Sequence, residues 1–246
     1  MNLDRVIAVR NNKTIYRDGD KCIKVFHEGY SKADILNEAL NQAKMEESGL
    51  SIPKVLEVTN VDGNWAIVFE YVKGKTLDRL MKEEPENKEE YLALLAELQA
   101  GVHSRSCELL NRMMDRLSVK ISQSELPATV RYDLYYRLQN MPKRDDICHG
   151  DFVPSNIIIA EDGTPFILDW SHVTRGNALS DAARTYLLLG LSAGEADAAK
   201  YLELYCEKTG AAEQDIRQWI AIVAAAQSVQ GNAQERAYLL GQAMNI

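Results

Sequence analysis

Two short apolar runs joined by a tight turn constrain the fold of this chain more than any other feature. The runs are residues 157–159, Ile-Ile-Ile, and residues 166–168, Phe-Ile-Leu, with Glu-Asp-Gly-Thr at residues 161–164 between them. β-Branched and aromatic residues on both sides of Asp-Gly are typical of a β-hairpin. We therefore expect two antiparallel strands whose open end carries Asn156 roughly opposite Asp169.

The open end of this hairpin brings together side chains that suit a magnesium ion. Facing Cβ atoms in a strand pair lie about 5 Å apart, so the Asn156 amide and the Asp169 carboxylate can share one cation. Mg²⁺ prefers oxygen ligands and usually takes only one or two from the protein, because water and substrate phosphates supply the others. Asp151 precedes this asparagine by five residues, in a loop with Gly150 and Pro154 that can present it as a general base. The segment thus predicts a Mg²⁺–nucleotide site beside a base.

These residues carry a resemblance to a known family. An Asp, an Asn five residues later and an Asp before an aromatic residue resemble the catalytic and metal loops of aminoglycoside phosphotransferase-type small-molecule kinases, within the protein-kinase-like fold. The resemblance implies that Asp151 accepts or orients the proton of the substrate hydroxyl, and that Asn156 and Asp169 hold Mg²⁺. It also implies that His149 braces the loop. Regulated protein kinases usually carry Arg in place of Gly150, so the resemblance is to a constitutively active metabolic kinase.

The tripeptide His149-Gly150-Asp151 also has a purely structural interpretation. His-Gly-Asp alone is a common turn sequence, and an isolated match would be structural in most proteins. The combined spacing of base, asparagine, hairpin and second aspartate is what favours a kinase site.

The N-terminal residues are expected to form nucleotide-binding strands. Residues 14–17 and 21–26 have strand composition and are joined by Asp-Gly-Asp at residues 18–20. Lys24 lies in the second strand. A lone lysine there commonly extends along the edge of a sheet to reach solvent. The resemblance instead implies that Lys24 neutralises the α- and β-phosphates of a nucleotide.

A helix expected from Ser31 to about Glu47 supplies a candidate partner for this lysine. Ser31 and Asp34 are spaced as the start of a capping box. Glu38 is the best candidate to pair with Lys24. It lies off the apolar stripe of the helix, so exposure to solvent is the alternative.

The next two strands, residues 55–58 and 65–72, end at a Lys-Gly-Lys turn. By resemblance, the end of the second strand is the hinge at which backbone groups near Glu70 and Val72 bind adenine, although an inner strand that ends at a glycine turn is compatible with the same residues. The phosphate-covering loop would be Arg-Asn-Asn-Lys at residues 10–13, which contains no glycine. Asn tolerates left-handed backbone, and Arg or Lys can meet phosphate by charge. The lack of glycine in this loop leaves the choice between ATP and GTP open.

Apolar spacing predicts helices from Thr76 onward. Their approximate ranges are 88–103, 131–138, 180–189, 195–208 and 214–228, with a short last helix after them. His103 is interpreted as a packing residue, and Ser180 as a helix cap. By resemblance Asp181 braces the catalytic loop, with Arg184 assisting, while a plain helix-dipole role for Asp181 is the alternative. The resemblance implies that these helices shape the acceptor pocket.

Composition agrees with a cytosolic enzyme. The 246 residues are 46% hydrophobic, and the four cysteines lack the spacing of a metal site and suit a reducing compartment. No signal-peptide core and no apolar stretch of about 20 residues is present, so we expect a soluble cytoplasmic protein without a membrane partner. A net charge of −8 argues against a nucleic-acid partner and is compatible with a cationic acceptor.

Together these patterns predict an α+β, two-lobed protein-kinase-like fold. Residues 1–72 would form a small antiparallel β-sheet lobe with one helix that binds the nucleotide. Residues 73–246 would form a larger, mainly helical lobe that carries catalysis and the acceptor. The predicted activity is transfer of the γ-phosphoryl group of Mg-ATP or Mg-GTP to a hydroxyl of a small molecule such as an aminoglycoside, amino alcohol or sugar.

Two other classes of function are compatible with the sequence. The glycine-free loop motivates a nucleotide-binding pseudokinase that serves as an interaction module. A metal-dependent phosphohydrolase could use His149, Asp151, Asp169 and His172, but that interpretation leaves Lys24 unexplained.

Overall fold

The contacts within the chain divide it into two compact units. The computed structural model describes residues 3, 5–10 and 12–245. The first unit combines the residues up to Leu80 with Pro154–His172, and the second combines Met81–Val153 with the residues from Val173 onward. The predicted hairpin thus groups with the N-terminal strands by its contacts, whereas the sequence assigned it to the C-terminal lobe. The two functional lobes, divided near residue 72, stay a prediction.

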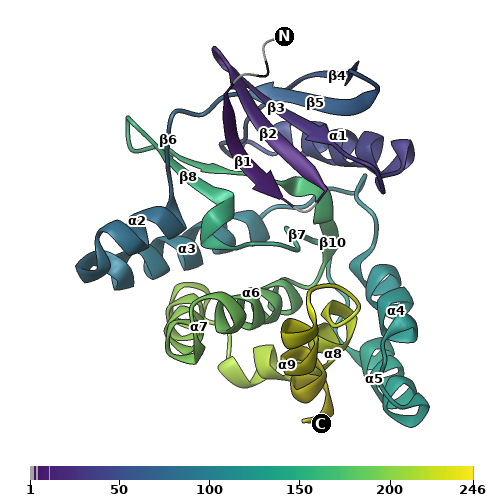
Figure 1. Cartoon of the computed structure of the whole chain (residues 1–246). Coiled ribbons are helices and arrows are strands. Elements are labelled where there is room, and N and C mark those ends of the chain that lie inside the picture. The colour runs from purple at the N-terminus through teal and green to yellow at the C-terminus, as the bar shows by residue number, and fades with distance from the viewer. Residues whose placement is uncertain (1–2, 4, 11, 246) are drawn as a thin grey trace. The chain divides into compact units, whose positions relative to one another are not determined.

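The described part of the first unit is built on a five-stranded sheet with the order β1-β2-β3-β5-β4 (Figure 1). Every neighbouring pair in it is antiparallel. The strands are β1 (Val6–Arg10), β2 (Lys13–Asp18), β3 (Lys21–Phe26), β4 (Val55–Val61) and β5 (Asn64–Glu70). The strands expected from the sequence are therefore present. Gly19 has a φ of 59° in the turn between β2 and β3, a conformation that glycine adopts without steric cost. Asn11, in the glycine-free loop, lies outside the described residues.

Helix α1 (Lys32–Glu46) covers one face of this sheet (Figure 1). It begins as the sequence predicts, because the Ser31 hydroxyl accepts a hydrogen bond from the Asp34 N–H at 3.1 Å. Its residues Ile35 and Ala39 belong to a core cluster with three sheet residues, Phe26, Ile67 and Phe69. This packing fixes which face of α1 is turned toward the sheet.

The hairpin predicted from the sequence is present as β8 (Ile157–Ala160) and β9 (Pro165–Ile167), and β6 (Gly74–Thr76) pairs with the other edge of β8. The register between β8 and β9 differs from the expectation by one residue. Ile157 pairs with Ile167, and the Leu168 N–H donates to the Asn156 carbonyl at 2.8 Å, so these two residues face each other at the open end. Asp169 therefore lies one position beyond the place opposite Asn156. The 3₁₀ turns η2 (Pro154–Asn156) and η3 (Trp170–His172) flank the hairpin.

The described part of the second unit is mainly helical (Figure 1). Its elements are η1 (Pro85–Asn87), α3 (Lys88–His103), α4 (Met113–Gln123), α5 (Ala128–Asn140), α6 (Ala178–Ser192), α7 (Glu195–Thr209), α8 (Glu213–Gln227) and α9 (Ala233–Met244), with α2 (Leu77–Glu83) across the boundary between the units. Two short strands, β7 (Asp146–Cys148) and β10 (Thr174–Gly176), pair antiparallel. Helix α8 is the most buried, with Trp219 only 1% exposed, and it packs against α4, α5, α6 and α9. It is the core around which the unit assembles.

Most of the predicted helices are present. Helices α3, α7 and α8 match the expected ranges closely, α9 is the expected last helix, and α5 extends the range expected around residues 131–138 at both ends. The start of α6 differs from the prediction. Asn177 caps it by accepting a hydrogen bond from the Leu179 N–H at 2.9 Å, whereas Ser180 is buried inside the first turn. The cap assigned to Ser180 is therefore wrong.

The sequence did not predict α4. Its apolar residues Met113, Leu117 and Ile121 recur every four residues and are buried, but the residues between them are mostly polar. No helix among the described residues has the length and apolar composition needed to cross a membrane.

Candidate functional site

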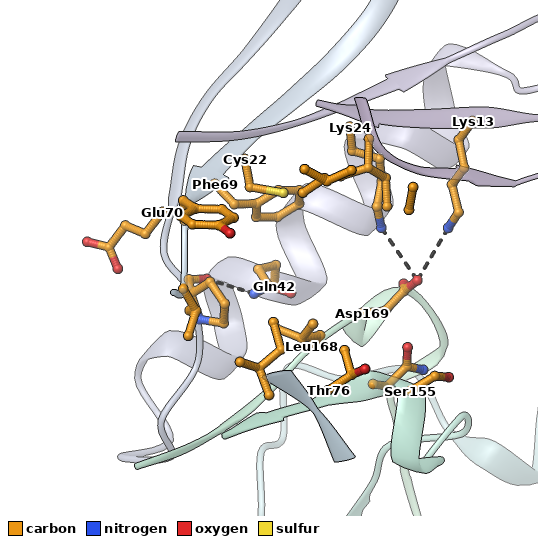
Figure 2. Close-up of a pocket in the computed structure, with 18 of the residues that line it drawn as sticks. Lys13, Cys22, Lys24, Gln42, Phe69, Glu70, Thr76, Ser155, Leu168 and Asp169 are labelled. Carbon is orange, nitrogen blue, oxygen red and sulfur yellow. Dashed lines mark hydrogen bonds and ion pairs between the residues drawn. The ribbon is translucent and has the colours of Figure 1, made fainter. Parts of the chain in front are cut away.

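A cavity of about 260 Å³ lies within the first unit (Figure 2). One part of its lining is apolar and is formed by Ala8, Ile15, Cys22, Phe69, Ile158 and Leu168. Another part carries charged or polar groups, those of Lys13, Lys24, Asn156 and Asp169. An apolar slot that ends in cations and oxygen ligands suits a planar base joined to phosphates.

Lys24 is a buried cation with carboxylate partners. Strand β3 places it in the sheet, where it is only 7% exposed, and its Nζ lies 2.5 Å from Glu38 Oε1 and 3.5 Å from Asp169 Oδ2. Burial by itself would lower the pKa of Lys24, but the charges of Asp169 and Glu38 outweigh it, so the pKa is raised and the ammonium stays protonated. A buried ammonium is tolerated only when it is compensated in this way.

The pairing of Lys24 with Glu38 expected from the sequence is thus present. Glu38 is only 7% exposed, so the solvent-exposed alternative does not describe this structure. Helix α1 brings Glu38 inward because its apolar neighbours face the sheet. The role of the pair in phosphate binding stays a prediction.

Asp169 is held in an unusual backbone conformation. Its φ is 58°, in the left-handed region, which a residue other than glycine adopts at a cost of about 1–2 kcal/mol. Its Oδ2 lies 3.3 Å from Lys13 Nζ, and its Oδ1 accepts a hydrogen bond from the Ser171 hydroxyl at 2.8 Å. Burial alone would raise the pKa of Asp169, but Lys24 and Lys13 outweigh it and the pKa is lowered. Asp169 is therefore a permanent anion at the charged end of the cavity, and Lys13 is a second cation there.

Asn156 and Asp169 line the same cavity, as the hairpin prediction requires. Their chemistry fits Mg²⁺, because a carboxylate and an amide oxygen are hard ligands and Mg²⁺ needs only one or two from the protein. Their function as a metal pair stays a prediction.

The residues of the predicted hinge also line this cavity. Glu70 ends β5, Val72 follows two residues later, and both contribute to the lining. The Glu70 carboxylate accepts a hydrogen bond from the Lys54 N–H at 3.2 Å and points away from the slot in Figure 2. The N–H groups of Glu70 and Tyr71 donate to the carbonyls of Lys54 and Asp20. Any hydrogen bond to the purine base of a nucleotide would therefore involve other backbone groups, such as the Glu70 carbonyl and the Val72 N–H.

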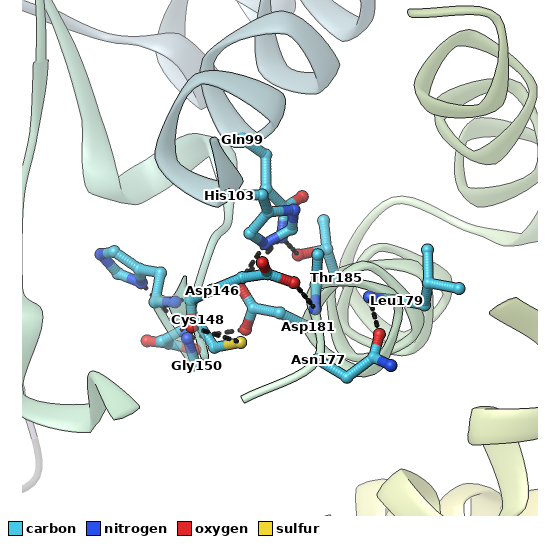
Figure 3. Close-up of polar contacts among 12 residues, drawn as sticks. Gln99, His103, Asp146, Cys148, Gly150, Asn177, Leu179, Asp181 and Thr185 are labelled. Carbon is cyan, nitrogen blue, oxygen red and sulfur yellow. Dashed lines mark hydrogen bonds and ion pairs between the residues drawn. The ribbon is translucent and has the colours of Figure 1, made fainter. Parts of the chain in front are cut away.

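Asp151 belongs to the second unit, in the loop that follows β7. A buried carboxylate, Asp181, holds this loop (Figure 3). Asp181 accepts hydrogen bonds from the N–H of His149 at 3.0 Å and from the N–H of Gly150 at 2.8 Å. His149 in turn accepts one from the Asp151 N–H at 3.1 Å through its Nδ1. Asp181 and His149 thus brace the loop, and a role of Asp181 limited to the helix dipole is excluded.

Asp181 also contacts two side chains of helix α3. Its Oδ2 lies 3.0 Å from His103 Nε2 and accepts a hydrogen bond from Gln99 at 3.1 Å. Burial would raise the pKa of Asp181, but the hydrogen bond and charge of His103 and the contacts with the loop lower it to about 2. His103 also bonds Tyr205 Oη, at 2.7 Å. The interpretation of His103 as a packing residue was therefore incomplete, since it links the loop's carboxylate to α7.

Three cationic side chains, which we call the cation cluster, act on the Asp151 carboxylate: Arg116, Lys120 and Arg184. Arg116 and Lys120 lie one turn apart on α4, and Arg184 lies on α6. All three side chains are partly buried. Burial, followed by the charges of Arg184 and Arg116, lowers the pKa of Lys120 to about 7. Burial and then Arg184 likewise lower the pKa of Arg116 to about 10.

Sequence reasoning named only Arg184 among these cations. Arg116 and Lys120 were missed because α4 was not predicted. Their spacing of four, beside apolar residues with the same spacing, was the signal that could have placed them on one helix face.

Comparisons with known proteins bear on the fold and the family. A family model described as the phosphotransferase enzyme family matches residues 7–219. The crystal structure of the aminoglycoside phosphotransferase APH(4)-Ia is similar, with a TM-score of 0.71 and 15% identity over 96% of this chain and 90% of that chain. The choline kinase LicA from Streptococcus pneumoniae gives a TM-score of 0.69 and 17% identity over 98% of this chain and 93% of that chain. No curated protein matches the chain by sequence.

At these low identities the similar structures show the fold alone, which is the predicted kinase-like fold. The family is shown by the sequence, since the model spans most of the chain. This chain therefore belongs to the phosphotransferase enzyme family.

Proposed function

We propose that this chain is a small-molecule kinase that transfers the γ-phosphoryl group of Mg-ATP or Mg-GTP to a hydroxyl group. The observation that carries the proposal is the buried Lys24, held between Glu38 and Asp169 at the charged end of a cavity whose other part is mainly apolar. Membership of the family supports phosphoryl transfer as the reaction. One similar structure is that of an APH(4)-Ia mutant in a ternary complex with AMP-PNP and hygromycin B, so that protein binds a nucleotide analogue and a second small molecule together.

The nucleotide would bind in the first unit. Its base would occupy the apolar slot and bond the backbone near Glu70 and Val72. Lys24 and Lys13 would neutralise the phosphates. A Mg²⁺ ion held by Asn156 and Asp169 would supply further charge neutralisation at the phosphate oxygens. The side chains of this cavity provide the two requirements for such binding, apolar contact and fixed charge.

The acceptor hydroxyl would react at Asp151. Its oxygen forms a bond to the γ-phosphorus while the bond from that phosphorus to the bridging oxygen breaks, and the nucleoside diphosphate leaves with the bridging oxygen. Asp151 aligns the hydroxyl and takes its proton. Asp181 acts as a positioning residue, because it holds the backbone of the loop that presents Asp151. Catalysis comes chiefly from positioning and charge neutralisation.

Transfer of labelled γ-phosphate tests this proposal. ATP and GTP are each offered with Mg²⁺ and a panel of aminoglycosides, amino alcohols and sugars, and labelled product is expected with at least one acceptor class. Asp151→Asn should lower kcat about 10²- to 10⁴-fold, the usual contribution of a general base, and leave nucleotide affinity nearly unchanged. Asp145→Asn, which changes an exposed carboxylate of the same unit, is the matched control. An Asp151→Asn protein as active as this control would show that Asp151 is not the base.

A second candidate function is a nucleotide-binding pseudokinase. The observation that favours it is the loop between β1 and β2, which lacks glycine in its sequence. Tight Mg²⁺-dependent nucleotide binding without transfer to any acceptor would support this alternative. Hydrolysis of phosphoesters with no nucleotide present would instead support a phosphohydrolase.

A further inference from the structure

Cationic side chains gather around Asp151 in the second unit. The three members of the cation cluster act on this one carboxylate. The neighbouring carboxylate, Asp181, is already engaged by a histidine, a glutamine and two backbone N–H groups. Three cations among the described residues thus act on one carboxylate, although the whole chain has a net charge of −8.

The fold of the second unit places these cations together. Helices α4 and α6, which carry them, both pack against α8. Arg116 and Lys120 share one face of α4 because residues four apart in a helix are neighbours. Lys120 Nζ donates to Gln230 Oε1 at 3.0 Å, which holds its ammonium group near the connection between α8 and α9. The cluster is thus built by the packing of helices and not by one flexible side chain.

Arg184 gives a second and independent indication of a ligand. Its Nε is buried and has no hydrogen-bond partner within the described part of the chain. A buried donor of this kind is rare in folded proteins and destabilises them. Grouped like charges also destabilise a compact state. An anionic ligand at the guanidinium group would offset both costs.

We propose that the molecule phosphorylated by this chain carries an anionic group, a phosphate or a carboxylate, which binds Arg184, Lys120 and Arg116 while its hydroxyl lies at Asp151. This inference rests on the proposed kinase function and names the substrate class of the same site. Guanidinium groups bind such oxyanions through paired hydrogen bonds, and an ammonium group adds a point charge. An acceptor at Asp151 would meet the cation cluster directly, so these neighbours bear on its charge more than the net charge of the chain does.

Binding of a small anion tests the inference without knowledge of the acceptor. The full chain is first saturated with Mg²⁺ and AMP-PNP, so that added inorganic phosphate cannot occupy the nucleotide site. The thermal midpoint is then followed as phosphate is raised at constant ionic strength, with chloride as the balancing anion. A parallel titration with acetate separates a site for phosphate from one for carboxylate.

Three variants make the test specific. Arg184→Gln and Lys120→Gln each remove one charge of the cluster. Lys208→Gln is the matched control, because Lys208 is also a helical lysine with a bond to another segment, at 2.9 Å to Glu97. We expect saturable stabilisation of the wild type and of Lys208→Gln by phosphate or acetate. The apparent affinity should fall about tenfold in the two cluster variants, the usual loss of one charge-assisted hydrogen bond.

Either of two results would overturn the inference: no saturable stabilisation of the wild type by either anion, or equal stabilisation of all four proteins. If Arg184→Gln does not fold, the comparison of Lys120→Gln with Lys208→Gln decides the outcome. Affinity for AMP-PNP, measured in the same samples, distinguishes a failure of the anionic-acceptor proposal from a failure of the proposed kinase function. Intact Mg²⁺-dependent AMP-PNP binding without an anion response overturns the anionic acceptor alone, whereas absent AMP-PNP binding overturns the proposed kinase.

Discussion

The two units hold their buried charges in opposite ways. In the first unit, Lys24 and Lys13 face Glu38 and Asp169 at distances from 2.5 to 3.5 Å, so cations and anions alternate. In the second unit, the cation cluster surrounds the single carboxylate of Asp151. The first arrangement pairs its cations with carboxylates of the same unit, whereas the second groups like charges, as the proposed site for an anionic ligand requires.

This difference indicates which charged residues stabilise the fold and which are available to bind a ligand. Removing a member of a compensated set leaves a buried charge without its partner and destabilises the protein. Removing a member of a group of like charges relieves repulsion and stabilises the unliganded protein, while ligand binding weakens. Substitutions in the set around Lys24 and in the cation cluster should therefore shift stability in opposite directions.

The largest effect is expected at Asp169, where the compensated set meets the nucleotide. Asp169→Asn removes the carboxylate proposed to hold Mg²⁺, so Mg²⁺-dependent affinity for AMP-PNP should fall by about 100-fold or more. Calorimetric titration with and without Mg²⁺ measures this change. Ser171→Ala is the control, because it removes only the hydroxyl that donates to Asp169 Oδ1. Unchanged Mg²⁺-dependent affinity in Asp169→Asn would remove this residue from the metal site.

Asp181 offers the largest expected change in stability. Asp181→Asn replaces a buried acceptor of four hydrogen bonds by an amide whose NH₂ group must face a donor, so the free energy of unfolding should fall by about 3 kcal/mol. The pKa of Asp181 is about 2 in the folded protein, below the ordinary value of 3.8, so the unfolded chain binds more protons between these pH values. The stabilisation from Asp181 is complete above about pH 4 and is lost as pH falls through 2.

Urea unfolding at several pH values checks this prediction. The difference between wild type and Asp181→Asn should be largest at neutral pH and should narrow below about pH 4. The exposed Asp145→Asn substitution should change stability little at any of these pH values. A constant difference across the acid range would show that the charge of Asp181 does not stabilise the loop.

Local signals explain why most of the fold and the first site could be predicted. The cap at Ser31, the lysine within an apolar strand and the Asp-Gly turn of the hairpin each act through residues close in sequence. The choice of Asn177 over Ser180 as a cap was missed because both residue types are good caps three positions apart. The position of Asp169 was missed by one residue because the turn sets the register: the Ala160 N–H donates to the Thr164 carbonyl, and Ile157 then pairs with Ile167.

The second site depends on contacts that join distant parts of the chain. His103 meets Asp181 across 78 positions, and the cation cluster joins α4 to α6. A single sequence carries no direct signal for such pairs. Sequence patterns therefore could not show which charged residues lie near Asp151, and the charge of the acceptor was inferred from the net charge of the chain alone.

A smaller loss of stability is expected at Glu38, in the compensated set. Glu38→Gln leaves Lys24 buried with Asp169 as its remaining partner, so the free energy of unfolding should fall by about 2 kcal/mol, less than for a pair with no other compensation. Urea unfolding measures this change. Glu47→Gln, an exposed position just beyond α1, is the control and should change little. Equal stability of the two variants would mean that the pair with Lys24 does not stabilise the first unit.

The smallest effect, with the opposite sign, is expected at Lys120. Lys120→Met keeps the length of the side chain and removes a charge that burial and two arginines disfavour, although it also loses the bond to Gln230. The unliganded protein should therefore gain about 1 kcal/mol in the free energy of unfolding at pH 7. Because the pKa of Lys120 is about 7 in the folded protein and its ordinary value is 10.5, the unfolded chain binds more protons between these pH values and wild-type stability rises with pH there. The gain should be greatest at and below pH 7 and should vanish near pH 10. Thermal unfolding at pH 7 and pH 9.5 measures it, and a loss of stability at pH 7 would show that the cation cluster is compensated within the chain and that the contrast between the two units does not hold.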